Sequence, residues 1–461
     1  MRSEPVVVVD AEQEETLERV AAVDVAKATG RVCTRLPDPG RRGKRVTRVW
    51  EVPATTNAII ELGDQLMVEG VERVVVESTS DYWRPFVYLL GAAGLRVWLV
   101  NAREVKNVPG RPKTDTIDAV WLAKLNERGM LRPSFVPPAQ IRQLRDYTRL
   151  RSDLVAERSR HKQRLEKLLE DALIKLSTVA SDIFGVSGRV MLEALIAGRR
   201  DPRQLADLAR GKLRVKQAAL VEALTGRFDD HHAEIARMLL DQVDSLDAQI
   251  DRITARIDQL LTDIPEPVDP TTSGQDSGEG GGEGSGEGSG GSAPCEASRY
   301  YPPAQRLAEI PGIGLKAAQV IIAEIGLDMR QFPTAKHLAS WAKLSPRTIQ
   351  SGPRNRSGQT GKGNPYLKSV LGEAAAAASR TDTFLGERYR RLVKRRGKLK
   401  ALVAVARSIL VIIWQLLANP HARYHDLGRD YHNTRIDKNR KVRTHLRQLQ
   451  ALGYHVTLTT T

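Results

Sequence analysis

The run Val-Ala-Ala-Val-Asp-Val at residues 20–25 is apolar except for one carboxylate, Asp24. A second run, Arg-Val-Val-Val-Glu at residues 73–77, ends on another, Glu77. Short apolar runs of this kind are typical of buried strands. Because burying a charge without a partner is costly, an acid within or at the end of such a strand indicates a function. We therefore start from these two strands and their acids.

The residues around these strands predict a mixed α/β domain. Strands are expected at 30–36, 45–52 and 96–100, and helices at 55–68, 82–93 and 114–127. The resulting order is three strands in a hairpin meander, then helix, strand, helix, strand and helix.

Two further acids open the last of these helices. The stretch Lys-Thr-Asp-Thr-Ile-Asp-Ala at residues 113–119 places Asp115 and Asp118 three positions apart, on one helical face. A strand Asp, a strand-end Glu and a helical acid pair, in this order, are similar to the ribonuclease-H-like layout, in which strand ends and helix start converge. Acidic oxygens there hold two Mg²⁺ ions, about 3.5–4 Å apart, for phosphoryl transfer. We expect Asp24, Glu77, Asp115 and Asp118 to form such a site.

Each acid also has a simpler interpretation. Asp24 alone could flank a turn, and Asp115 alone could cap a helix. Asp10, after the apolar residues 6–9, is a rival for the strand acid. It ranks lower because no hairpin turn and second strand follow it closely. The metal site is favoured because all four acids occur together in the expected order.

Composition divides the rest of the chain. Residues 265–298 contain 10 Gly, 6 Ser and seven acids, with no Lys or Arg, which predicts a flexible linker. Apolar residues at three- and four-residue steps predict long helices at 141–176 and 230–264, forming an antiparallel stalk with a helical insertion at about 185–226. An ordinary helical bundle is the alternative. The expected regions are 1–135 (catalytic), 136–264 (helical stalk), 265–298 (linker), 299–420 (second domain) and 421–461 (basic tail).

The charge of the chain points to a polyanionic partner. Its 461 residues carry a net charge of +16, with 41% hydrophobic residues, which is enough for packed cores. From Gly386 to Gln450 the net charge is +13, and residues 346–368 hold five basic residues and no acid. Candidate nucleic-acid contacts are Lys113, Arg347, Arg354, Arg356, Lys362, Asn364 and Lys368.

Two motifs mark the region after the linker. Pro-Gly-Ile-Gly at 311–314 resembles a helix-hairpin-helix turn, whose amides could hold a DNA phosphate. A plain packing turn accounts for it equally well. A loop rich in Gly, Ser, Arg and Lys follows, with Ser351 and Ser357, and leads to a helix expected at 365–380. From composition alone, Ser351 is an ordinary turn serine.

Taken together, these segments resemble the DEDD transposases of insertion sequences, which are bridge-RNA-guided recombinases. The resemblance covers residues 20–127 and about 305–418. It is carried by Val-Asp-Val-Ala-Lys at 23–27, Val-Glu-Ser-Thr at 76–79, residues 113–119, Ile-Pro-Gly-Ile-Gly at 310–314, Gln-Ser-Gly at 350–352 and Gly-Asn-Pro-Tyr-Leu-Lys at 363–368. The long acidic linker and the tail beyond about 420 depart from it.

The resemblance implies a fold and a chemistry. It implies a ribonuclease-H-like (RuvC-like) domain, a helical coiled-coil stalk and a mainly α serine-bearing domain. Asp24, Glu77, Asp115 and Asp118 would bind two Mg²⁺ ions, with Mn²⁺ as a substitute. Ser351 would form a transient phosphoserine link to DNA, although Ser357 stays an alternative. Element-end and target DNA, a structured guide RNA and a second copy of the chain, in a dimer or tetramer, would be the partners.

Two other classes of function stay open. A structure-specific nuclease would use the same four acids without the serine, and a nucleic-acid-binding protein would use neither. The acidic start of the chain does not resemble a signal peptide, and Cys33 and Cys295 do not form a zinc motif, which favours a reducing compartment. The resemblance implies a cytoplasmic, nucleoid-associated location in a prokaryote. The apolar stretch 399–417 contains Arg407, so a buried helix is expected rather than a membrane span.

Overall fold

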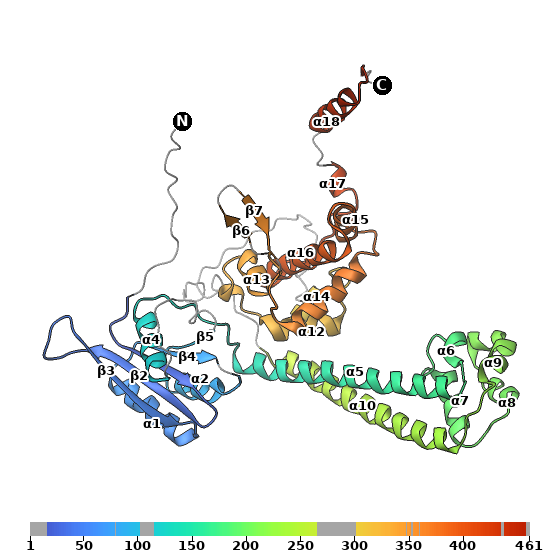
Figure 1. Ribbon diagram of the computed structural model, residues 1–461, viewed down its shortest axis with the longest axis horizontal. Helices are drawn as coiled ribbons and strands as arrows, with labels where there is room; N and C mark the ends of the chain where they lie inside the picture. The colour runs from blue at the N-terminus through green and yellow to red at the C-terminus, as the bar shows by residue number, and fades with distance from the viewer. Residues whose placement is uncertain are drawn as a thin grey trace, which may run out of the picture. The chain divides into compact units, whose positions relative to one another are not determined.

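The chain combines a small mixed sheet with a large helical region (Figure 1). A computed structural model describes residues 16–78, 80–101, 115–264, 301–346, 348–351, 354–358, 360–434 and 438–457. The chain divides into two compact units, residues 1–136 and 137–461. The mixed α/β prediction is confirmed for the first unit, and the second is mostly helical.

A five-stranded sheet forms the centre of the first unit. Its strands are β1 (Val20–Val25), β2 (Thr29–Pro37), β3 (Arg45–Pro53), β4 (Arg73–Ser78) and β5 (Val97–Asn101). The order is β3-β2-β1-β4-β5. β1, β2 and β3 form the expected antiparallel meander, whereas β4 and β5 are added in parallel to β1. The central strand β1 is therefore paired on both sides.

Helices cover both faces of this sheet. α1 (Thr56–Val68) and α2 (Trp83–Ala92) pack on one face, where Ile59 and Phe86 meet Val23. α4 (Asp115–Glu127) packs on the other face, where Leu122 meets Val75. Strand residues alternate between these two cores, as the pleat of a sheet requires. The strand-and-helix order read from the sequence is confirmed, with bounds that differ by one or two residues.

Two long helices, α5 (Ala139–Asp171) and α10 (Asp230–Asp263), form the antiparallel pair expected for a stalk (Figure 1). α5 ends five residues earlier than predicted, because Leu173 adopts a positive φ of 59° that ends the helix. Asp229 caps the start of α10, since its carboxylate accepts a hydrogen bond from the His232 amide at 3.1 Å.

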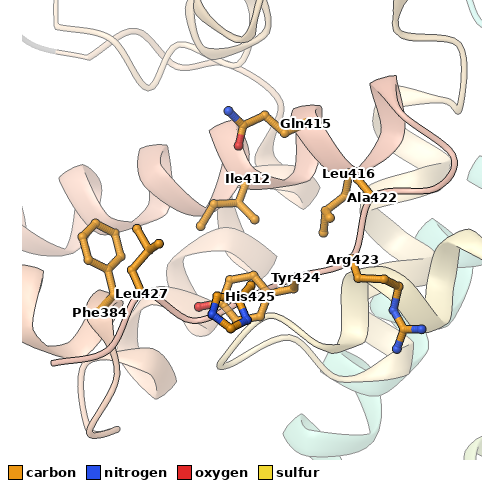
Figure 2. A pocket seen from close by; sticks show the side chains of 9 residues that line it. All are labelled: Phe384, Ile412, Gln415, Leu416, Ala422, Arg423, Tyr424, His425 and Leu427. Carbon is orange, nitrogen blue, oxygen red and sulfur yellow. The ribbon is translucent and has the colours of Figure 1, made fainter. Parts of the chain in front are cut away.

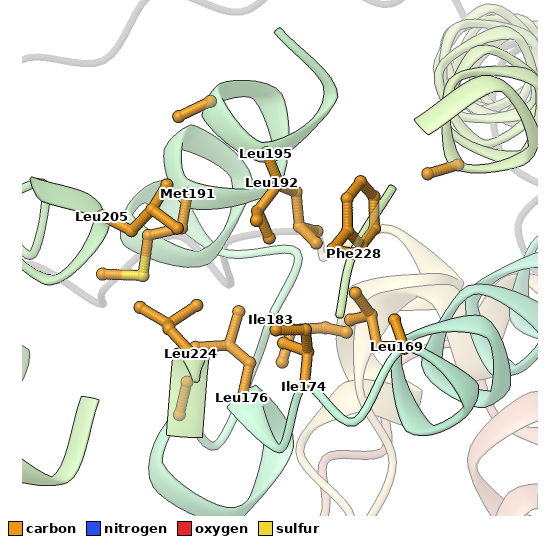
Figure 3. Close-up of a cluster of buried hydrophobic side chains, with 14 of the residues drawn as sticks. Leu169, Ile174, Leu176, Ile183, Met191, Leu192, Leu195, Leu205, Leu224 and Phe228 are labelled. Atoms are coloured by element: carbon orange, nitrogen blue, oxygen red, sulfur yellow. The ribbon is translucent and has the colours of Figure 1, made fainter. Parts of the chain in front are cut away.

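The far end of the pair carries a cluster of short helices with its own core (Figure 3). These are α6 (Leu176–Val179), α7 (Val186–Ile196), α8 (Pro202–Ala206), η1 (Gly211–Lys216) and α9 (Gln217–Leu224). Leu169 of α5, Met191 of α7 and Leu224 of α9 are among the buried side chains that join them. The helical insertion predicted at about 185–226 is therefore present.

A second group of helices follows residue 301. It consists of α11 (Pro303–Ala308), α12 (Leu315–Ile325), η2 (Met329–Gln331), α13 (Ala335–Trp341), β6 (Thr348–Ser351), β7 (Arg354–Ser357), α14 (Pro365–Ala378), α15 (Phe384–Arg396), α16 (Lys398–Ala418), α17 (Tyr431–Thr434) and α18 (Lys438–Ala451). α12 packs against α5, so this group and the stalk belong to one unit. The finer division into separate domains stays a prediction.

The apolar helix α16 lies at the centre of this group. Among the described residues it is the one helix whose length and composition would allow a membrane span. Its buried residues, such as Val405 and Ile409, face α11, α13, α14 and α15. Trp414 donates its indole N–H to the carbonyl of Phe332 at 2.8 Å. These contacts are those of a core helix.

Described residues on the two sides of the predicted linker line one pocket. This pocket, of about 360 Å³, is formed by the end of α10 together with α11 and α12. Ile264, just before the linker, and Pro302, just after it, both line the pocket. Residues 265–300 themselves lie outside the described part of the chain. The described residues on either side of this segment, Ile264 and Pro302, therefore lie on the same surface of the second unit.

Candidate active site

Asp24 and Glu77 occupy equivalent positions on neighbouring parallel strands. β1 and β4 pair in parallel with Val23 opposite Val76, so the two acids are the next residues along each strand. The carboxyl ends of parallel strands are where sheets of this kind bind ligands. The register thus places two carboxylates side by side at one edge of the sheet.

Both acids lie on the face of the sheet that α4 covers. Ala22 and Val75, two residues before each acid, pack in the core beneath α4. Residues two apart on a strand share a face, so Asp24 and Glu77 share that side. Glu77 is only 5% exposed, and Asp24 is half-buried. The sequence-predicted pair is therefore brought together at the covered face.

α4 brings a third acid to this face. Asp118 precedes the fully buried Leu122 by four residues, which places both on the sheet-facing side of the helix. Asp118 is half-buried. Asp115 is the first residue of α4, and its side chain lies outside the described atoms. The fold thus places Asp24, Glu77 and Asp118 on the same face of the sheet, with Asp115 one turn nearer the start of the helix.

The donor set suits a hard divalent cation. Carboxylate oxygens are the ligands that Mg²⁺ and Mn²⁺ prefer, and the three described acids offer only these. In the described part of the chain no group of three His, Cys, Asp or Glu side chains is arranged to hold a metal ion. The Asp115 side chain and residues 102–114 are outside that part. Metal binding by the four acids stays a prediction.

A buried arginine that sequence reasoning missed fastens α4 to the sheet. Arg73 of β4 is fully buried, and its Nε donates to Asn126 Oδ1 at 2.7 Å. Its guanidinium also lies 3.8 Å from the ring centroid of Trp98. Asn126 Nδ2 donates to the carbonyl of Ala21 at 3.0 Å, which ties the helix to β1. This network fastens the C-terminal end of α4, the end away from Asp118, to β1 and β4.

The two candidate serines lie at opposite ends of a hairpin. The sequence predicted a loop here, whereas β6 and β7 pair as antiparallel strands. Ser351 is opposite Arg354 in the last pair before the turn, and Ser357 is opposite Thr348 in the first pair. The β-branched residues Thr348 and Ile349 favour strand over loop. Ser351 is therefore the serine at the hairpin tip.

The predicted nucleic-acid contacts divide into four groups. Arg354 and Arg356 lie on β7, and Lys113 and Arg347 lie outside the described residues. Lys362 is exposed in the segment before α14. The remaining two have partners within the protein, as Lys368 Nζ donates to the Gly361 carbonyl at 2.6 Å and Asn364 caps α14.

A second buried network, also missed from the sequence, anchors the segment after the hairpin. Glu324 of α12 is fully buried. Its two carboxylate oxygens accept hydrogen bonds from the guanidinium group of Arg149 of α5, at 2.7 and 2.8 Å. The hydrogen bond to Glu324 raises the pKa of Arg149. Asn364 Nδ2 also donates to Glu324, at 2.5 Å, while its Oδ1 accepts from the Leu367 amide at 3.1 Å. The stalk, α12 and the start of α14 are thereby joined at one carboxylate.

The Pro-Gly-Ile-Gly turn packs inside the helical group. Gly312 has a φ of 89°, and a Cβ there would lie 2.3 Å from the carbonyl of Ala374 in α14. Gly314, at the start of α12, has open space around it. The first glycine is therefore required for packing, while only the second could approach a phosphate.

A separate hollow of about 290 Å³ lies between α15, α16 and the segment after α16 (Figure 2). Phe384, Ile412 and Leu427 give it apolar walls, and His425 lines it. Burial raises the pKa of Tyr424, whose hydroxyl donates to Asp426 at 3.1 Å. None of the predicted site residues lines this hollow.

Two family models match the chain. The DEDD transposase model of the IS110 type, described as a transposase, matches residues 21–174, and a model described as the transposase IS116/IS110/IS902 family matches residues 304–390. Together they cover more than half of the chain. The first match contains all four acids, and the second contains Ser351.

Curated relatives agree with these matches. A probable family 20 transposase of Pseudomonas aeruginosa is 35% identical over 120 residues, which are 25% of this chain and 35% of that protein. A pilin gene-inverting protein of Moraxella bovis is 34% identical over 118 residues, 25% of this chain and 36% of that protein. The chain thus spans about a third of each of these relatives. An insertion element IS900 protein of Mycobacterium paratuberculosis is 27% identical over 365 residues, 74% of this chain and 80% of that protein.

Proposed function

The chain belongs to the IS110 family of DEDD transposases, and from this we propose that it excises and inserts a mobile element by cutting and rejoining DNA strands. The observation that carries the proposal is the register of Asp24 and Glu77 on neighbouring parallel strands, beneath the helix that bears Asp118. Such a group of carboxylates in a ribonuclease-H-like domain is suited to phosphoryl transfer.

The acids and the serine have different roles in this proposal. Asp24, Glu77, Asp115 and Asp118 would hold two Mg²⁺ ions, which neutralise charge that develops on the phosphate oxygens. Burial of Glu77 and half-burial of Asp24 and Asp118 limit their access to water, which strengthens electrostatic interactions there. Each carboxylate therefore acts by position and charge, and a neutral amide at the same place cannot replace it.

Ser351 is the proposed nucleophile. Its Oγ would attack the scissile phosphorus, losing its proton to a carboxylate, while the leaving deoxyribose oxygen takes up a proton. The resulting phosphoserine ester retains the energy of the broken bond. The hydroxyl of a second strand then displaces the serine and completes the exchange without ATP. The place of Ser351 at the hairpin tip supports this role, because a tip can approach a backbone more closely than a hairpin base.

The partners follow from the family and the charge. We propose that the protein binds element ends and target DNA, together with a structured guide RNA, as a homo-oligomer in the cytoplasm. The net charge of +16 supports binding to nucleic acid of either kind. Copurification of a structured RNA encoded beside the gene would test the guide. If the purified active protein carries no RNA and needs none, the guided form of the proposal is wrong.

The decisive experiment traps the covalent intermediate. Labelled element-end DNA is incubated with protein and Mg²⁺, denatured, and examined for label migrating with protein. Wild type and Ser357→Ala are expected to carry label. Ser351→Ala and Asp24→Asn are expected to bind DNA and carry none, because one lacks the nucleophile and the other lacks a ligand charge.

Two outcomes would contradict this. Label on Ser351→Ala but not on Ser357→Ala would move the nucleophile to the base of the hairpin. Strand cleavage by wild type without any label would favour a hydrolytic nuclease that uses the same acids.

A further inference from the structure

The helices α15 and α16 form a strongly basic hairpin. They are joined by Gly397, whose φ of 78° allows the sharp reversal, and they pack against each other. Residues 384–418 hold nine Lys and Arg but a single acid, Glu387. Most of these cations therefore cannot be neutralised from within the hairpin.

The arginines of this hairpin differ in their exposure and in their hydrogen-bond partners. Arg390 is paired, since its Nε donates to Glu387 at 3.0 Å and its Nη1 donates to the Thr381 carbonyl at 3.2 Å. Arg388 is different, because its Nε is buried and has no hydrogen-bond partner among the described residues. Arg391 of α15 and Arg407 of α16 are exposed and form no ion pair with any described carboxylate.

Arg391 and Arg407 lie close enough to Arg388 to repel it. Burial lowers the pKa of Arg388, and the positive charges of Arg407 and Arg391 lower it further. Arg388 and Arg391 are three residues apart on α15, which puts them on one helical face, and Arg407 belongs to α16, which packs against α15. Like charges gathered around a buried, unsatisfied donor are unfavourable in the protein alone.

We propose that Arg388, Arg391 and Arg407 form a binding site for a backbone phosphate of nucleic acid. A phosphate would accept hydrogen bonds from these guanidinium groups, and its charge would offset the repulsion that Arg391 and Arg407 exert on Arg388. Further exposed cations, Lys394, Arg395 and Arg396, continue along α15 and suit a polymer of phosphates rather than a single free ion. This inference rests on the proposed function, of which it names a further contact surface.

The test compares two triple variants of the full chain. One is Arg388→Gln, Arg391→Gln and Arg407→Gln. The matched control is Arg160→Gln, Arg256→Gln and Arg330→Gln, which removes the same charge from exposed positions elsewhere in the second unit. Binding of a labelled DNA duplex and of a labelled RNA hairpin is measured over a range of KCl concentrations.

The site variant is expected to bind at least one probe about tenfold more weakly than the control. Its plot of log affinity against log salt should be shallower by about 0.9 for each phosphate of duplex DNA that the variant no longer neutralises. A weaker affinity for one probe alone assigns the phosphate to DNA or to RNA. Equal binding of both probes by the two triple variants would overturn the proposal.

Two further readouts distinguish a phosphate site from a purely structural role of these arginines. Arg388→Met should leave the melting temperature unchanged or raise it, because it removes a buried unsatisfied donor; a clear fall would make Arg388 a structural residue and refute the site. The trapping experiment with Ser351 separates the two proposals. If the wild type forms the adduct but the two triple variants bind nucleic acid equally well, the transposase proposal stands and only the phosphate-site proposal fails.

Discussion

Single buried residues decide how the catalytic face is built. Asn126 satisfies Arg73 with its side-chain and backbone oxygens, at 2.7 and 2.9 Å. We expect Asn126→Ala to lower the free energy of unfolding of the first unit by about 2–4 kcal/mol, because a buried guanidinium loses charge-assisted hydrogen bonds. Arg31→Ala, which breaks a partly exposed pair with Glu51, should cost under about 1 kcal/mol.

Hydrogen exchange of peptides from β1 and α4, combined with thermal unfolding, would measure both changes. Equal effects of the two substitutions would mean that the Arg73 network does not hold α4 in place.

Cys33 gives the first unit a dependence on alkaline pH. Burial raises the pKa of its thiol from 9.0 to about 11, although Arg35 and Lys124 oppose the shift. The folded state therefore keeps a proton that the unfolded state releases. The stabilisation is complete below pH 9 and is lost as the pH rises to about 11, amounting to about 2–3 kcal/mol.

Urea unfolding between pH 8 and 11 would show this, with Cys295→Ser as the background and Cys33→Ala as the comparison. The variant should lack this part of the alkaline decline. If both proteins decline identically, the thiol makes no contribution.

At the scale of elements, the Pro-Gly-Ile-Gly turn offers a matched pair of substitutions. Gly312→Ala should destabilise the helical group by about 2–4 kcal/mol, since it adds a Cβ 2.3 Å from the Ala374 carbonyl and requires a positive φ. Gly314→Ala should change stability little, because nothing lies within 4 Å of its added Cβ.

Thermal unfolding of each variant checks the pair. Similar melting temperatures for the two would show that α11 and α12 do not pack on α14 as described. A loss of nucleic-acid affinity confined to Gly314→Ala would indicate that the turn also contacts phosphate.

At the scale of the whole molecule, the linker is expected to be dispensable for the fold. Ile264 and Pro302 line one pocket, so the two residues that flank the replaced segment lie on a single surface. Replacing residues 265–300 by about 12 Gly and Ser residues should raise the free energy of unfolding by about 1 kcal/mol or leave it unchanged, because a shorter loop costs less entropy to close. Recombination should persist.

Thermal unfolding and the trapping assay, each compared with a neutral linker of the original length, would test this. Loss of the adduct in the short variant alone would show that the linker sets a distance needed for activity.

The sequence by itself determined the local elements and the candidate acids. β1 and β4 are short apolar runs that end near an acid, and α10 has apolar residues at helical spacing over its length; such patterns depend on neighbours in sequence. The positions of Asp24, Glu77 and Asp118 on one side of the sheet follow from strand order and from the alternation of side chains. For this reason the sequence could predict the four acids as one site, and their binding of metal stays a prediction.

Tertiary structure decided what depends on distant partners. Arg73 and Asn126 are 53 residues apart, and Arg149 and Glu324 are 175 apart. No periodicity marks such pairs, because each is selected by the burial of a charge when two elements pack. The pairing of β6 with β7, the position of Ile264 and Pro302 at one pocket, and the packing of α15 against α16 have the same origin. The sequence determines which charged residues are present. The packing of the elements determines which of them pair within the protein and which remain available to bind a ligand.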